Sequence, residues 1–389
     1  AFLGAVFDGA TAAWHIPSFA NMVVKFNTTT GVMTGFNTWP AGFTAGGRFN
    51  GGTFDGQKIW MAPASANMIV SIDQSNSAMT GYNTWPAGFT TTVFGGVIFD
   101  GKFVWLTPFS SGTMVIRLDS TTGVMTGFSV PTSQGSIAAG SISIDFATSS
   151  LWIAPYSSST IFKLTFAEQT PVPATPPPAM SKTMSLPATT PVPTPAPTPS
   201  PAPASGILLQ TGFSFTGSVT GSPLTGATMA STTYTVNPSA DGCSGQTCYL
   251  GSILVGDYLW MIPYKATKVV RVHIGTGART GYNAWPAGFP SSPLRFIGSA
   301  YASASNKIWM MPTAGVNPVS IDTTTGTMTM CSTWPAGYND KGFGGGFISG
   351  DNVWMAPSDA NMIVSVAIST CAMTGYNTWP GGFVPGVGA

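Results

Sequence analysis

The side chains of this sequence that could do acid–base or metal chemistry are two histidines and 13 acids, in a chain of 389 residues. Three of the acids, Asp8, Asp55 and Asp100, each stand between a phenylalanine and a glycine. A carboxylate in that setting caps a tight turn, and a group that recurs in one slot is more often structural than catalytic. Five further aspartates stand in comparable turns: Asp73, Asp119, Asp257, Asp322 and Asp351.

The two histidines break this repetition, so they are the candidates for chemistry. His15 stands where other copies of its phrase have Met, Leu or Ile, and His273 lies in a separate copy. An enzyme would need His15 or Asp8 to meet a partner from a distant part of the chain. The sequence shows no Ser/His/Asp order, phosphate-binding loop or metal-spaced cluster. We therefore predict no catalytic, cofactor-binding or metal-binding residue, and a protein that is not an enzyme.

A short phrase, Trp-x-x-Pro, recurs seven times and sets the period of the chain. Its tryptophans are Trp14, Trp60, Trp105, Trp152, Trp260, Trp309 and Trp354. Successive copies are 45 to 49 residues apart, except for one interval of 108 residues. This period is typical of a β-propeller, in which each blade is a sheet of four short strands.

A second phrase, Met-Thr-Gly-Tyr-Asn-Thr-Trp-Pro-Ala-Gly-Phe at 79–89, recurs nearly unchanged at 33–43 and 373–383. We interpret it as the outermost strand of a blade, followed by the turn that leads to the next blade. Blades stack face to face, so Tyr82 and Trp85 are expected to be packing groups rather than ligand groups. The sequence thus predicts an all-β fold, a seven-bladed β-propeller of four-stranded blades.

The long interval contains a proline-rich segment, 170–205, in which 13 of 36 residues are proline and only Lys182 is charged. Such a segment cannot bury a core and favours extended polyproline II. We place it between the third and fourth strands of blade four, with 160–165 as the third strand and 209–214 as the fourth. Residues 216–250 are then an enlarged loop or extra hairpin before blade five, with a degenerate eighth blade as the alternative.

A linker between two domains is the other interpretation of this segment. Three complete copies of the repeat follow it, however, and three blades are too few to close a ring. The predicted organisation is therefore one propeller in three stretches. They are 1–168 with blades one to three and the first part of blade four, a proline-rich insert at 169–205, and 206–389 with the last strand of blade four, a cysteine-containing loop and blades five to seven.

The four cysteines suggest an oxidising compartment. Cys243 and Cys248 are close enough in sequence for a local disulfide, and no second ligand pair completes a zinc site. Cys331 replaces the Tyr or Phe of one outer strand, and Cys371 replaces the turn glycine of the next copy. A second disulfide between these two neighbouring blades is therefore expected.

The composition disfavours two kinds of partner. Only 7% of the residues are charged and the formal net charge is +1, whereas nucleic acids and anionic membranes need clustered Lys and Arg. No apolar run approaches the roughly 20 residues that span a bilayer. The sequence begins at Ala1 without Met, which suits a secreted chain without its signal peptide, although a trimmed sequence would look the same.

The Ala-Pro, Thr-Pro, Ser-Pro and Val-Pro dipeptides of the insert resemble the hydroxyproline-rich glycoproteins of green-algal and plant cell walls and surface appendages. The resemblance implies hydroxylated prolines with short O-linked glycans, and an unmodified linker is the alternative. The candidate prolines are Pro171, Pro173, Pro191, Pro193, Pro195, Pro197, Pro199, Pro201 and Pro203. One N-glycosylation sequon is present, Asn27-Thr28-Thr29.

Three functional hypotheses follow. The first is a secreted structural glycoprotein that assembles with copies of itself into an extracellular fibril, appendage or cell-wall layer, since repeated faces favour head-to-tail contacts. The second is a carbohydrate- or protein-binding module at the cell surface. The third is a lyase or hydrolase that uses the central channel. We expect the protein to be secreted, outside the cell or at its surface.

Overall fold

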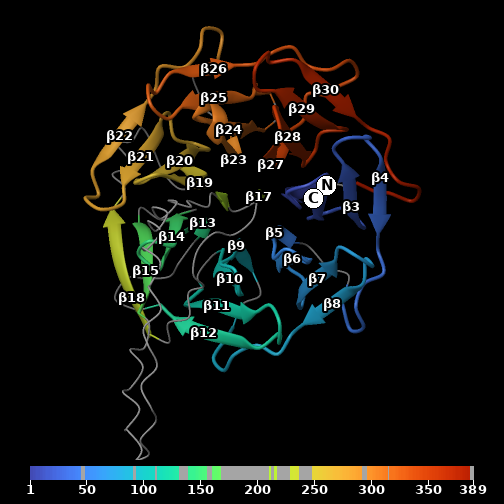
Figure 1. Ribbon diagram of the computed structural model, residues 1–389, viewed down its shortest axis with the longest axis vertical. Helices are drawn as coiled ribbons and strands as arrows, with labels where there is room; N and C mark the ends of the chain where they lie inside the picture. Colours follow the sequence, from blue (N-terminus) through green and yellow to red (C-terminus); the bar gives the residue numbers. More distant parts are fainter. Residues whose placement is uncertain are drawn as a thin grey trace, which may run out of the picture.

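The computed structural model describes residues 1–44, 49–90, 93–109, 112–130, 139–155, 160–167, 210–211, 214–216, 228–235, 248–290, 296–313 and 315–385. These residues form seven sheets arranged as blades around a central axis (Figure 1). Each blade has four antiparallel strands, and two further short strands, β16 (Gln210–Thr211) and β17 (Ser214–Thr216), extend the sheet of blade one. The predicted seven-bladed propeller is confirmed. The predicted polyproline II segment at 170–205 lies outside the described residues.

The blades follow one another along the chain, and each runs from the axis outward. Blade one contains β1 (Phe2–Phe7), β2 (Ala12–Pro17), β3 (Val23–Asn27) and β4 (Met33–Phe36). Blade two contains β5 (Phe49–Phe54), β6 (Lys58–Pro63), β7 (Ile69–Asp73) and β8 (Met79–Tyr82). Blade three contains β9 (Phe94–Phe99), β10 (Phe103–Pro108), β11 (Met114–Asp119) and β12 (Met125–Ser129). Blade four contains β13 (Ala139–Asp145), β14 (Ser150–Pro155), β15 (Thr160–Ala167) and β18 (Thr228–Thr235).

The second half of the ring repeats the pattern. Blade five contains β19 (Tyr249–Val255), β20 (Tyr258–Pro263), β21 (Val269–His273) and β22 (Arg279–Tyr282). Blade six contains β23 (Phe296–Ala302), the short 3-10 helix η2 (Ser303–Ser305), β24 (Lys307–Pro312), β25 (Val319–Asp322) and β26 (Met328–Met330). Blade seven contains β27 (Phe343–Ser349), β28 (Asn352–Pro357), β29 (Ile363–Ala367) and β30 (Met373–Tyr376).

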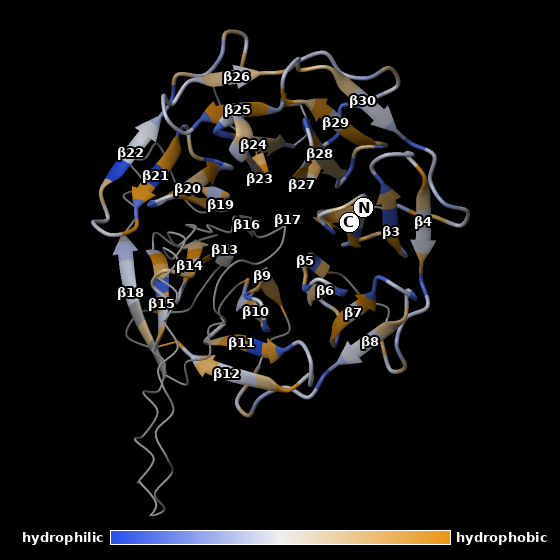
Figure 2. Cartoon of the chain, in the orientation of Figure 1, coloured by the Kyte–Doolittle hydropathy of each residue, from blue (hydrophilic) through white to orange (hydrophobic). Residues whose placement is uncertain are grey.

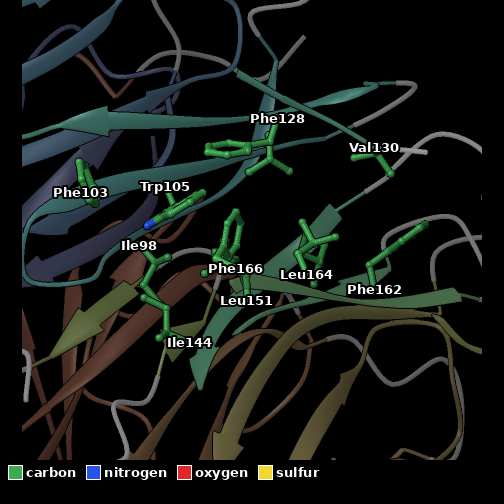
Figure 3. Packing of buried hydrophobic residues seen from close by; sticks show 13 residues of the cluster. Ile98, Phe103, Trp105, Phe128, Val130, Ile144, Leu151, Phe162, Leu164 and Phe166 are labelled. Carbon is green, nitrogen blue, oxygen red and sulfur yellow. The ribbon is translucent and has the colours of Figure 1, made fainter. Parts of the chain in front are cut away.

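The core lies between neighbouring blades. Each Trp-x-x-Pro tryptophan sits on the second strand of its blade and is at most 3% exposed. Between blades three and four, the rings of Trp105 and Phe166 lie 4.4 Å apart, and Phe128 packs beside them (Figure 3). Cutting a buried ring of this size back to Ala typically costs about 3–5 kcal/mol. The hydrophobic residues gather on the inner three strands, and the outermost strands are paler in Figure 2.

The repeated outer-strand phrase packs one blade onto the next. The ring of Trp85 stacks on Phe89 at 4.5 Å, and both rings lie against Phe94 of blade three. Tyr82 packs against Trp60 at 5.0 Å. The prediction that Tyr82 and Trp85 are packing groups is thus confirmed.

The glycine of this phrase is required by close packing. A Cβ on Gly81 would overlap the sulfur of Met68, and it would lie 3.2 Å from Pro40 of the preceding return turn. The same arrangement recurs in blade three, where a Cβ on Gly127 would overlap the sulfur of Met114. The glycine of the phrase is therefore repeated because it must fit against a methionine near the start of the third strand and the proline of the preceding return turn.

Blade four departs from the sequence prediction. Its outer strand is β18, not the expected 209–214, and β18 pairs with β15 over eight positions from Thr160↔Thr235 to Ala167↔Thr228. Tyr234 of β18 packs beside Trp152 at 5.2 Å, as Tyr82 does beside Trp60. The eighth blade and the extra loop or hairpin expected within 216–250 were therefore wrong for 228–235. A long strand with the packing tyrosine outcompetes a short segment that resembles the phrase in only a few letters.

Candidate functional site

The central axis, where a propeller usually has a channel, is the first place to look for a ligand site. Two short strands from the long interval lie there: β17 (Ser214–Thr216), labelled near the centre of Figure 1, and β16 (Gln210–Thr211), which pairs with it. β17 pairs in parallel with β1, with Ala5 opposite Ser214. β16 lies against β13, β19 and β23, while β17 lies against β5, β23 and β27. The innermost strands of six blades thus surround β16 and β17, and the chain itself occupies its axis.

The aspartates of the Phe-Asp-Gly turns have structural partners. One oxygen of Asp55 accepts hydrogen bonds from two N–H groups of its own turn, and the other accepts the indole N–H of Trp60 at 2.7 Å. Asp100 makes the same contacts, with Trp105 at 2.7 Å. The carboxylates of Asp55 and Asp100 thus link the hairpin turn to the buried tryptophan, and both have a structural role.

Asp8 shows how one extra residue changes this arrangement. Six positions separate Asp8 from Trp14, against five between Asp55 and Trp60. The second oxygen of Asp8 accepts the side-chain amide of Gln74 of blade two at 2.8 Å. The indole nitrogen of Trp14 is left without a hydrogen-bond partner among the described residues. Asp8 therefore connects two blades and is not directed at a reacting group.

His15 is buried at the junction of blades one and seven. Its side chain is 0% exposed and packs between the rings of Phe2 (5.4 Å) and Phe26 (6.3 Å). Neither ring nitrogen has a hydrogen-bond partner among the described residues. Desolvation by burial lowers the pKa of His15 to about 3, so the imidazole is neutral at ordinary pH. A group that no substrate can reach is not a general acid or base.

His273 is explained by the turn it occupies. Its Nδ1 accepts the N–H groups two and three residues further on, at 3.1 and 3.2 Å. The carboxylate of Asp322 caps the equivalent turn of blade six at 2.9 and 2.8 Å. Backbone hydrogen bonds, chiefly from Thr325, hold the pKa of Asp322 below its usual value. His273 thus replaces an aspartate as a turn cap, because a neutral imidazole nitrogen also accepts hydrogen bonds.

Asn27, the residue of the N-glycosylation sequon, occupies the same turn in blade one. Its side-chain oxygen accepts the N–H groups of Thr29 and Thr30, both at 2.9 Å. Asn27 is partly exposed and Thr29 is exposed, at the rim of the disc. The sequon therefore lies in an accessible turn, as modification requires.

The structure contains the expected disulfide between blades six and seven. Cys331 and Cys371 are bonded, with their Cα atoms 5.3 Å apart. At other junctions the same two slots hold a tyrosine and a glycine: Gly123 lies against the ring of Tyr82 so closely that a Cβ would be 2.7 Å from it. The pairing of Cys243 with Cys248, and all nine candidate hydroxyprolines, involve residues outside the described part of the chain.

A pocket lies at the rim between blades six and seven. It has a volume of about 450 Å³ and is lined by the β23–β24 connection and by the turns of blade seven. Within the described ranges, no three His, Cys, Asp or Glu side chains are grouped to hold a metal ion. The structure, in those same ranges, has no helix of the length and hydropathy needed to cross a membrane.

Comparison with known proteins supports the fold. No protein-family model matches the sequence, and a search of curated proteins finds no relative. Among solved structures, PorZ of Porphyromonas gingivalis, a bacterial surface component of the type-IX secretion system, is similar with a TM-score of 0.54 and 9% identity over 98% of this chain and 38% of its own. The extracellular domain of a B. thetaiotaomicron protein named as a hybrid two-component system gives 0.55 and 13%, over 92% of this chain and 39% of its own.

The WD40 β-propeller domain of Doa1 is similar with a TM-score of 0.54 and 8% identity, over 92% of this chain and 90% of its own. The chain spans about two fifths of the length of the first two structures. At these identities the likeness shows the propeller fold alone. The class of protein defined here is therefore a seven-bladed β-propeller.

Proposed function

We propose that the protein is a structural subunit of an extracellular assembly of copies of this chain, and not an enzyme. The observation that carries the proposal is the occupied axis. β16 and β17 lie among the innermost strands, at the central channel in which the enzyme hypothesis places its substrate. The two histidines, Asp55 and Asp100 are used in packing and capping.

An extracellular location agrees with two findings. The disulfide between Cys331 and Cys371 persists in an oxidising environment. Two of the similar structures are a bacterial surface component and an extracellular domain. The low charge and the repeated outer faces favour contact between identical discs, and head-to-tail contacts that do not close make filaments.

Covalent glycans are part of this proposal. Asn27 in its accessible turn, and the prolines of the insert that resemble hydroxyproline-rich glycoproteins, would carry them. Enzymatic release of N-glycans converts a glycosylated Asn27 to aspartate, which peptide mass spectrometry of native protein detects. Hydroxyproline in peptides from 170–205 would support the second kind of modification, and unmodified proline there would leave a plain linker.

Self-association is tested by sedimentation velocity of the purified full chain over a concentration series. We expect species whose mass grows as the concentration rises. A single monomeric boundary at every concentration would contradict assembly by this chain alone.

A binding module is the second candidate function. The pocket between blades six and seven favours it, because this cavity is of small-molecule size.

A further inference from the structure

The rim between blades six and seven breaks the repeat twice. In blade six, β23 and β24 are joined through η2 and Asn306, whose backbone is left-handed (φ 53°), where blades two and three have short Asp-Gly turns. In blade seven, as in blade five with Gly256-Asp257, the order of the two turn residues is reversed, Gly350-Asp351. The longer connection of blade six and the reversed turn of blade seven line one cavity at this junction.

The reversal changes what the carboxylate does. Asp55 caps its own hairpin and binds the buried tryptophan, as described above. Asp351 is exposed instead, and it accepts a hydrogen bond from the hydroxyl of Ser369 in the turn after β29. The indole nitrogen of Trp354 in the same blade has no hydrogen-bond partner among the described residues. Asp351 thus does not bind the buried tryptophan of its blade, as Asp55 does.

The pocket has an apolar interior and a polar mouth. Ala302 is buried, and Ile348 and Ile368 are partly buried against the core of the junction. Ser303, Asp351 and Ser369 are exposed, and Ser305 and Lys307 are partly exposed. The volume of about 450 Å³ lies in the usual range for small-molecule sites, about 300–1,000 Å³.

We propose that this pocket binds one neutral sugar residue, such as the terminal hexose or pentose of a glycan. A sugar presents a C–H face, which suits Ala302, Ile348 and Ile368, and a ring of hydroxyls. Asp351 accepts from a hydroxyl, Lys307 donates to one, and the serines do both. This inference names the ligand class of the second candidate function and does not depend on self-assembly.

The charges at the pocket favour a neutral ligand. An anion would meet the carboxylate of Asp351, and a cation would meet the ammonium of Lys307. A wholly apolar ligand would leave the polar mouth without hydrogen bonds, which is costly for groups that lose water. A polyol can satisfy both charged groups at once.

The test is saturation-transfer NMR with the full chain and a panel of methyl glycosides of neutral hexoses and pentoses. We expect transfer to at least one glycoside, and at least a tenfold weaker affinity in Asp351→Asn. Asp257→Asn is the matched control, because Asp257 also follows a glycine in the exposed inner turn of blade five. It should leave the affinity unchanged.

A second variant, Ala304→Trp, places a bulky side chain on an exposed residue that lines the pocket. It should abolish the transfer while the melting temperature stays near that of the parent chain. Transfer to none of the glycosides, or transfer that survives both Asp351→Asn and Ala304→Trp, would overturn the proposal. The measurement uses dispersed protein, so a failure of self-assembly would not alter its outcome.

Discussion

Asn21 donates from its side-chain amide to the carbonyl oxygen of Gly382 at 3.0 Å, across 361 residues of sequence. Its side-chain oxygen accepts the N–H of Val384, also at 3.0 Å. Asn67 makes the same bond to the carbonyl of Gly42, between consecutive blades, at 2.9 Å. Among the described residues, blades one and seven share no strand. The same kind of asparagine contact that joins blades one and two therefore also joins blades seven and one, and closes the ring.

Asn21→Ala is predicted to weaken the closure of the ring. The change removes two hydrogen bonds and should lower the free energy of unfolding by about 1–2 kcal/mol. It should also speed hydrogen exchange in β1 and β30, because no adjoining chain segment holds these two blades together. Asn67→Ala is the matched control and should cost a similar free energy without faster exchange in β1 and β30. Equal exchange in both variants would contradict this role of Asn21.

His15→Met is predicted to flatten the dependence of stability on pH. The folded pKa of about 3 lies below the ordinary value of 6.5, so the unfolded chain takes up a proton that the folded chain does not. The stability from neutral His15 is complete above pH 6.5 and is lost as the pH falls toward 3. The slope approaches about 1.4 kcal/mol per pH unit.

Urea denaturation between pH 7 and pH 4, roughly the window over which this proton is taken up, measures the slope. Methionine is the replacement because Met61 occupies the same slot in blade two. The reciprocal change, Met61→His, should introduce a similar slope at a junction that has none from this source. An unchanged slope in His15→Met would show that His15 is not the origin.

The disulfide between Cys331 and Cys371 is predicted to substitute for a tyrosine–glycine contact. Replacing both cysteines by serine should lower the free energy of unfolding by about 2–4 kcal/mol. The double variant Cys331→Tyr with Cys371→Gly restores the pair found at Tyr82 and Gly123. It should recover part of that loss in denaturant titrations, and a stability no better than that of the serine variant would argue against equivalent slots.

Gly81→Ala is predicted to be costly for a steric reason. The new methyl group overlaps the sulfur of Met68, which is 3% exposed and cannot move away freely. Overpacking of this kind costs about 1–3 kcal/mol. In blade five the methionine is replaced by Lys268, and a Cβ on Gly281 would be 3.1 Å from its flexible stem.

Gly281→Ala is therefore the control, and its free energy of unfolding should stay within about 0.5 kcal/mol of the parent value. Chemical denaturation of Gly81→Ala and Gly281→Ala measures the two free energies of unfolding. Similar losses in both would mean that the glycine is needed for its backbone and not for Met68.

The architecture could be predicted because the Trp-x-x-Pro phrase recurs seven times in the sequence. Seven tryptophans at near-constant spacing define seven sheets, and the Cys331–Cys371 disulfide follows from two departures in facing slots. The structural roles of Asp55 and Asp100 also follow from their repetition. Repetition reveals the structural residues because the same side chains pack in the same way in each blade.

Two features could not be predicted because they depend on tertiary competition. Residues 209–214 resemble the outer-strand phrase, yet the described residues there, 210–211 and 214–216, lie at the axis. Residues 228–235 form the outer strand of blade four, with Tyr234 in the packing position. The different use of Asp351 depends on a reversal of two letters, Gly-Asp for Asp-Gly, whose effect needs the geometry of the turn. The eight-position pairing of β18 with β15 decides the first case, and the direction of the Asp351 carboxylate decides the second.

The most direct test of the central claim is cryo-electron microscopy of native material, without recombinant expression. The proposal predicts regular filaments of stacked or chained seven-bladed discs, with density beyond the polypeptide at Asn27. Dispersed single discs at native concentration would contradict a structural subunit and would favour the binding module with its pocket between blades six and seven.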